Sequence, residues 1–84
     1  MEDAINTLIK LRHIFRDIFD DEALDISENT AKSDIEDWDS IAHVKIILAI
    51  EEEFNIRFTT EEVASIKTIG EFMKAIHQHT GKPL

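Results

Sequence analysis

The clearest helical pattern in this chain is found at residues 39–54, DSIAHVKIILAIEEEF. Asp39 or Ser40 supplies a side-chain oxygen suited to cap the first turn. The apolar residues that follow recur every three or four positions, so we predict that this helix is the most buried one. The residues of the predicted buried face are Ile41, Val44, Ile47, Leu48 and Phe54, with Ile46 and Ile50 widening it.

Three further helices are predicted on the two sides of this stretch. Apolar residues at helical spacing predict a first helix over residues 3–19. A short third helix is expected to begin near Thr60, and a fourth to end near His79. The signals that mark the helix ends are two capping boxes, Thr59 with Glu62 and Thr68 with Glu71, and two C-terminal breakers, Gly81 and Pro83.

Residues 20–38 show no helical period and are rich in acidic and small polar residues. Four scattered apolar residues, Leu24, Ile26, Ile35 and Trp38, predict that this long loop is ordered over the core. Its length would allow the first two long helices to lie parallel. The predicted fold is therefore an all-α four-helix bundle, with three longer helices, one short helix and a long first loop, in a single domain over residues 1–84.

Composition excludes several classes of partner and site. The 84 residues hold 18 acidic against 9 basic side chains, a net charge of −9, which argues against nucleic acid or an anionic membrane as partner and favours basic protein surfaces. The absence of cysteine excludes a disulfide scaffold, a thiolate zinc site and a cysteine nucleophile. No signal peptide pattern or membrane-spanning run is seen, so we expect a cytoplasmic protein. Separately, we expect a monomer.

Ser40 is the first candidate for chemistry. A serine at the start of a helix often only caps backbone N–H groups. The same position would also place a phosphoryl group on the Ser40 oxygen in the positive field of the helix N-terminus. His43 follows three residues later, but no third group is evident to orient its imidazole, so we interpret it as a surface histidine rather than the partner of a catalytic serine.

Three features together resemble the acyl carrier proteins: the long acidic loop, the motif Asp37-Trp38-Asp39-Ser40-Ile41, and a helix that closes on Glu51-Glu52-Glu53-Phe54. That family is recognised by Asp-Ser-Leu, and isoleucine replaces the leucine here. The resemblance implies that Ser40 carries 4′-phosphopantetheine, transferred from coenzyme A by a magnesium-dependent phosphopantetheinyl transferase. It also implies a non-catalytic carrier of acyl thioesters, which serves enzymes of fatty-acid, polyketide or related biosynthesis.

The resemblance extends to partner docking, since acids on the second helix of the family dock basic patches of partner enzymes. The docking residues expected here are Asp39, Ile41, Val44, Glu51 and Glu52. Trp38 stands where glycine or alanine is common, and His43 and Lys45 make the helix start less acidic. These departures suggest a different set of acyl-loading and acyl-processing enzymes.

Three alternatives remain open. A peptidyl or aminoacyl carrier is a close relative that the sequence separates poorly. An unmodified acidic interaction module would use Ser40 only as a cap. A calcium-responsive domain would use loop residues at positions one, three, five, nine and twelve of a calcium loop, although Thr30 takes the place of the required glycine and Lys32 opposes the ion. The residues at those positions are Asp25, Ser27, Asn29, Ser33 and Glu36.

Overall fold

The computed structural model describes residues 2–81 and contains four α-helices in that range. They are α1 (Glu2–Ile18), α2 (Ser40–Phe54), the short α3 (Thr60–Ser65) and α4 (Ile69–Thr80), with a 3-10 turn, η1 (Lys32–Asp34), inside the long loop. The all-α prediction is confirmed, and its helix limits agree with the structure to within about two residues. No helix in the described part of the chain is long and apolar enough to cross a membrane.

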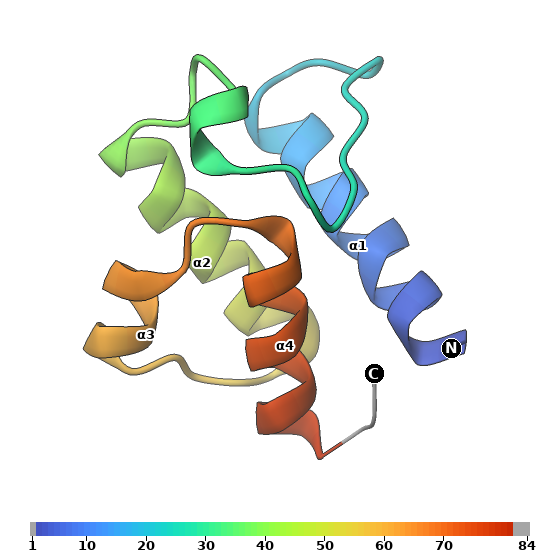
Figure 1. The fold of residues 1–84 in the computed structure, drawn as a ribbon, viewed down its shortest axis with the longest axis vertical. Helices are drawn as coiled ribbons and strands as arrows, with labels where there is room; N and C mark the ends of the chain where they lie inside the picture. Colours follow the sequence, from blue (N-terminus) through green and yellow to red (C-terminus); the bar gives the residue numbers. More distant parts are fainter. Residues whose placement is uncertain (1, 82–84) are drawn as a thin grey trace.

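The long loop returns the chain to the end of the bundle where α1 finishes. Figure 1 shows α1 running toward the loop, while α2 and α4 start beside the loop and run the opposite way. The sequence-based suggestion of a parallel first pair is therefore wrong, because α1 and α2 are antiparallel. The loop does not use its length to run the height of the bundle, since its backbone is bound to the start of α4.

Backbone hydrogen bonds hold the loop in place. The N–H of Lys32 donates to the Lys67 carbonyl at 2.8 Å, and the N–H of Gly70 donates to the Glu28 carbonyl at 2.9 Å. A Cβ atom at Gly70 would lie 3.1 Å from that Glu28 oxygen, so glycine permits the close approach. The prediction of an ordered loop is confirmed, although no pattern in the loop residues predicted η1.

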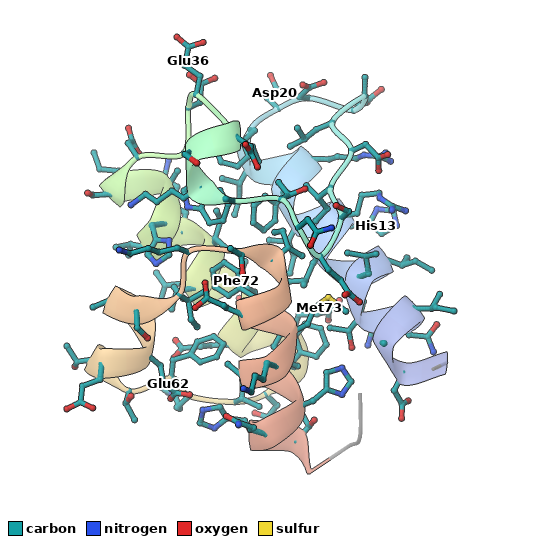
Figure 2. All side chains as sticks on the ribbon, viewed as in Figure 1. His13, Asp20, Glu36, Glu62, Phe72 and Met73 are labelled. Atoms are coloured by element: carbon teal, nitrogen blue, oxygen red, sulfur yellow. The ribbon has the colours of Figure 1, made fainter. Side chains whose placement is uncertain are left out.

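Aromatic rings form the centre of the core. Phe72 is fully buried, and its ring centroid lies 6.1 Å from that of Trp38 and 6.4 Å from that of Phe15. Trp38 also meets Phe15 edge to face at 5.1 Å. In Figure 2, Phe72 lies inside the bundle, whereas Glu36 projects away from it. Trp38 therefore anchors the loop in the core, together with Ile26, which is equally buried.

The buried face of α2 differs from the predicted one. Ile41, Val44 and Leu48 are 68, 52 and 59% exposed, so the prediction that they pack on the core is wrong. The run from residue 41 to 50 is apolar on nearly all sides, and periodicity alone does not select the side that packs. The residues of α2 that are buried are Ala42, His43, Ile46, Ile47 and Ile50.

The two predicted capping boxes have different outcomes. Thr59 and Glu62 exchange both hydrogen bonds, at 3.1 and 2.9 Å, as predicted. Thr68 caps α4 through the N–H of Glu71, but the Glu71 carboxylate accepts from the N–H of Lys67 and from the hydroxyl of Thr68 rather than from the N–H of Thr68, so the second box is incomplete. Gly81 ends α4 in the left-handed region with φ 73°, as predicted, and Pro83 lies outside the described residues.

Glu62 leads to a prediction about acid stability. The backbone N–H of Thr59 and, next, His79 stabilise the Glu62 carboxylate and lower its pKa from its ordinary value. Because the folded pKa lies below the unfolded one, this stabilisation is present at neutral pH and is lost as the pH falls through the lowered pKa. The melting temperature of Glu62→Gln should therefore lie below that of the wild type at neutral pH, and the gap should close in acid.

Thermal melts followed by circular dichroism between neutral pH and about pH 3 measure this gap. Glu61→Gln is the matched control, because Glu61 is the exposed neighbour in the same first turn. A gap for Glu62→Gln that does not change with pH would contradict the prediction.

Candidate functional site

Ser40 is the first residue of α2, and Asp39 is the residue that caps the helix. The backbone of Asp39 is extended, and its Oδ1 accepts the N–H of Ala42 at 2.8 Å. This geometry decides between the two caps that the sequence allowed. The Ser40 side chain is exposed, and its hydroxyl has no hydrogen bond to any residue between 2 and 81. Ser40 therefore presents a free hydroxyl at the start of a helix.

The backbone around Ser40 leaves donors for an anion. The N–H of Asp39 donates to the Asp37 carbonyl at 2.9 Å, and that of Ala42 is taken by the Asp39 carboxylate. The N–H groups of Ser40 and Ile41 have no acceptor among the residues that the structure describes. Together with the helix dipole, these two groups would favour a phosphate on the Ser40 oxygen.

His43 is buried, so its interpretation as a surface histidine is wrong. Its Nδ1 lies 3.1 Å from Nε1 of Trp38, and its Nε2 lies 2.8 Å from the Val63 carbonyl. An indole N–H only donates and a carbonyl only accepts, so Nδ1 accepts and Nε2 carries the proton. Both ring nitrogens are thus occupied, and His43 offers no base to Ser40.

The exposed apolar side chains of α2 form a ridge beside Ser40. We use "apolar ridge" for Ile41, Val44 and Leu48, which are spaced three and four residues apart on one helix face. Ile41 and Val44 were expected at a docking surface; both are exposed, and their role in docking stays a prediction. Leu48 was missed, although its spacing from Ile41 and Val44 is a signal that would have found it.

The three acidic residues expected to dock partners have different surroundings. Asp39 and Glu52 are exposed. Glu51 is half-buried, and its Oε2 accepts the backbone N–H of Phe58 at 2.9 Å, which ties the end of α2 to the next connection. Glu51 and Asp39 therefore both have structural roles, Asp39 as the cap of α2, while the exposed Glu52 carboxylate has no hydrogen bond to the described residues.

The structure does not bring the candidate calcium ligands together. Asp25 pairs with Arg12, with 3.1 Å between Oδ1 and Nε. The Ala31 carbonyl, at the seventh position of the loop pattern, accepts the N–H of Asp34 inside η1. Across residues 2–81, no three acidic or histidine side chains are arranged to hold a metal ion. The loop is thus built to pack on α4.

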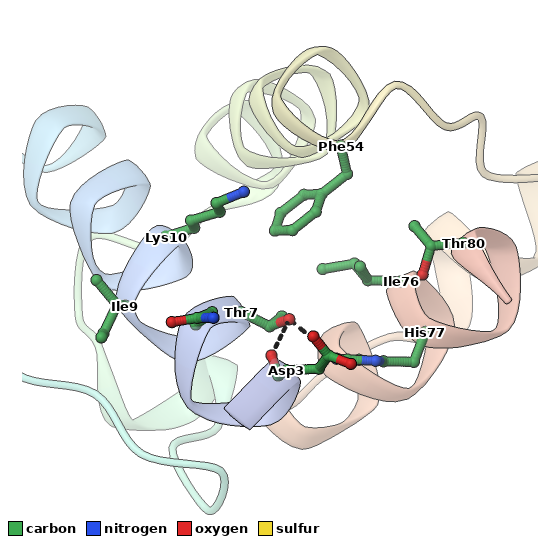
Figure 3. Close-up of a pocket in the computed structure, with 9 residues that line it drawn as sticks. Asp3, Thr7, Ile9, Lys10, Phe54, Ile76, His77 and Thr80 are labelled. Carbon is green, nitrogen blue, oxygen red and sulfur yellow. Dashed lines mark hydrogen bonds between the residues drawn. The ribbon is translucent and has the colours of Figure 1, made fainter. Parts of the chain in front are cut away.

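A cavity of about 240 Å³ lies at the other end of α2, between α1, Phe54 and α4 (Figure 3). The Thr7 hydroxyl donates to the Asp3 carbonyl at 2.7 Å, so it accepts from Nε2 of His77, which lies 2.9 Å away. His77 is therefore a second buried imidazole, remote from Ser40. Because Ser40 and Phe54 are opposite ends of one helix, this cavity is separate from the Ser40 site.

Comparisons with known proteins give matches over most of the chain. The sequence pattern of the family described as "Phosphopantetheine attachment site" matches residues 10–76. The chain is 35% identical to an acyl carrier protein of Lactobacillus acidophilus over 86% of this chain and 90% of that one. It is 36% identical to an acyl carrier protein of a Picosynechococcus species, over 86 and 89% of the two chains.

A solved structure has a similar fold over most of this chain. The solution NMR structure of the holo acyl carrier protein from Geobacter metallireducens superposes with a TM-score of 0.82 at 31% sequence identity. The match covers 89% of this chain and 86% of that chain.

Proposed function

Because the chain belongs to the acyl carrier protein family, we propose that it is a non-catalytic carrier whose Ser40 receives a 4′-phosphopantetheine arm from coenzyme A. The observation that supports this most is that Asp39, and not Ser40, caps the start of α2. Asp39 caps the helix, which leaves the Ser40 hydroxyl exposed and without a partner in the described chain. A hydroxyl that has no structural role is available to a modifying enzyme.

The residues at the helix start fit a phosphate attached to Ser40. In the transfer, a bond forms between the Ser40 oxygen and a phosphorus of coenzyme A, the nucleotide part leaves, and the hydroxyl proton passes to a base of the transferase. The free N–H groups of Ser40 and Ile41 and the positive end of α2 then stabilise the phosphate. Neither of the two ring nitrogens of His43 takes part, because both are bonded elsewhere.

When bound, the arm supplies a thiol, which this chain lacks because it has no cysteine. Acyl intermediates would be held there as thioesters and delivered to enzymes of fatty-acid, polyketide or related biosynthesis. Tethering the cargo converts each encounter with an enzyme site into an intramolecular event at high effective concentration. The chain would act as a single domain and a monomer.

Partner enzymes are expected to dock on the apolar ridge and the acidic residues beside it. Ile41 and Val44 expose apolar surface next to Ser40, and Asp39 and Glu52 add negative charge. A basic rim around an apolar patch on the enzyme would complement this surface, with the charges guiding the encounter. The same face would serve the phosphopantetheinyl transferase and the enzymes that load and process the acyl group.

Intact-mass measurement tests the proposal. The protein is incubated with coenzyme A, magnesium and a broad-specificity phosphopantetheinyl transferase, and peptide fragmentation then locates the modification. We expect a mass increase of one phosphopantetheine, located on Ser40. No increase with several transferases would exclude the carrier function and leave an acidic interaction module.

A further inference from the structure

We propose that His43 is a positioning residue for the modification of Ser40, and that it acts through a buried hydrogen bond to Trp38. The expected effect on transfer to Ser40 rests on the proposed function, whereas the hydrogen bond itself does not. Trp38 lies two residues before Ser40 and His43 three residues after it. The bond between their rings therefore closes a side-chain clasp around the attachment segment. We use "Trp–His clasp" for these two residues.

The clasp holds both ends of the segment. Nε1 of Trp38 donates to Nδ1 of His43 at 3.1 Å, and the two rings lie edge to edge, with centroids 6.0 Å apart and planes 25° apart. Inside it, the N–H of His43 donates to the Asp39 carbonyl at 2.9 Å and closes the first turn of α2. Ser40 is thus flanked on both sides by residues whose side chains are bonded to each other.

The clasp is fixed to the rest of the protein on two sides. Trp38 lies nearly parallel to Phe72, at an interplanar angle of 15°, and so is anchored on α4. Nε2 of His43 donates to the Val63 carbonyl on α3 at 2.8 Å. Only this tautomer satisfies the indole N–H and the carbonyl together. The loss of the imidazole would leave both groups buried and unpaired, so the clasp has one stable arrangement.

A fixed clasp has a kinetic consequence. Ser40 is the nucleophile of the proposed transfer, and rates of transfer fall steeply when a nucleophile is held outside its productive geometry. Ile41 of the apolar ridge lies inside the clasped segment, but Val44 and Leu48 lie beyond it, so most of the expected docking surface does not depend on the clasp. Loss of the clasp should therefore lower kcat for phosphopantetheine transfer more than it raises KM.

The chain supplies a matched control in its second buried imidazole. His43 and His77 are 8 and 5% exposed, and each uses Nε2 in a hydrogen bond to another helix, but His77 lies at the end of the bundle remote from Ser40. His43→Leu and His77→Leu each remove a buried imidazole. A purely structural role would give both variants the same transfer kinetics when both are folded.

The experiment measures kcat and KM of transfer for the wild type and variants, at a temperature where circular dichroism shows each to be folded. We expect His43→Leu to lower kcat on the order of tenfold with little change in KM, and His77→Leu to leave kcat unchanged. His43→Gln, whose amide supplies both an acceptor and a donor, should recover part of the rate. Trp38→Phe keeps the ring and removes the donor, so it replaces His43→Leu if that variant does not fold.

Equal kcat values for His43→Leu and His77→Leu would overturn the inference. A wild type that accepts no phosphopantetheine would instead refute the proposed function. In that event the clasp is tested by hydrogen exchange of the Trp38 indole N–H and the Ala42 and His43 amides. Faster exchange in His43→Leu but not in His77→Leu would support the clasp, and unchanged exchange would overturn it.

Discussion

Replacing Ser40 with alanine is expected to abolish phosphopantetheine loading completely, while the free energy of unfolding changes by less than about 0.5 kcal/mol. Loading is lost because the only atom that forms the new bond is removed. Stability is kept because the Ser40 hydroxyl is exposed and has no hydrogen bond to the described residues, whereas the Asp39 carboxylate caps α2. Intact mass after incubation with the transferase and a urea unfolding curve measure the two effects.

Two comparison variants make this prediction specific. Asp39→Ala removes the cap and should cost about 1 kcal/mol. Ser33→Ala, at an exposed serine of η1, should leave loading unchanged. A stability loss in Ser40→Ala equal to that of Asp39→Ala would show that Ser40 caps the helix after all, and a mass increase in Ser40→Ala would place the arm on another residue.

Phe72→Ala is expected to be the most destabilising single substitution in the core, at about 3–5 kcal/mol. Its fully buried ring lies 6.1 Å from Trp38, 5.9 Å from His43 and 6.4 Å from Phe15, so its loss opens a cavity where the loop, α1, α2 and α4 meet. A domain of this length has a total stability of about 4–13 kcal/mol. The variant should therefore be partly unfolded near 37 °C or melt far below the wild type.

Thermal melts followed by circular dichroism and Trp38 fluorescence measure this loss. Leu48→Ala is the control, because Leu48 is also a large apolar residue but is 59% exposed, and its truncation should change stability by no more than about 0.5 kcal/mol. Equal losses for Phe72→Ala and Leu48→Ala would show that the aromatic cluster is not the centre of the core. In a destabilised Phe72→Ala protein, the Trp38 ring should also become more exposed to solvent, because it packs against Phe72.

Local patterns account for the features that the sequence predicted correctly. Helix periodicity, the capping box of Thr59 with Glu62 and the left-handed end at Gly81 each depend on residues within a few positions of one another. The same locality placed Ser40 at the start of α2, where the backbone alone provides free N–H groups. The all-α fold and the position of the candidate attachment residue therefore follow from short-range patterns in the chain.

The sequence by itself thus determined the helices, their ends and the exposed serine at the start of α2, whereas the tertiary structure alone decided which sides face inward. The bond of His43 to Val63 spans 20 residues, and the backbone bond of Lys32 to Lys67 ties the long loop to the start of α4. An apolar run such as residues 41–50 fits a core on several sides, so its buried face is chosen by partners that are distant in the chain. Whether a side chain is buried depends on what packs against it and not only on its polarity. For that reason His43 lies inside while Ile41 faces the solvent.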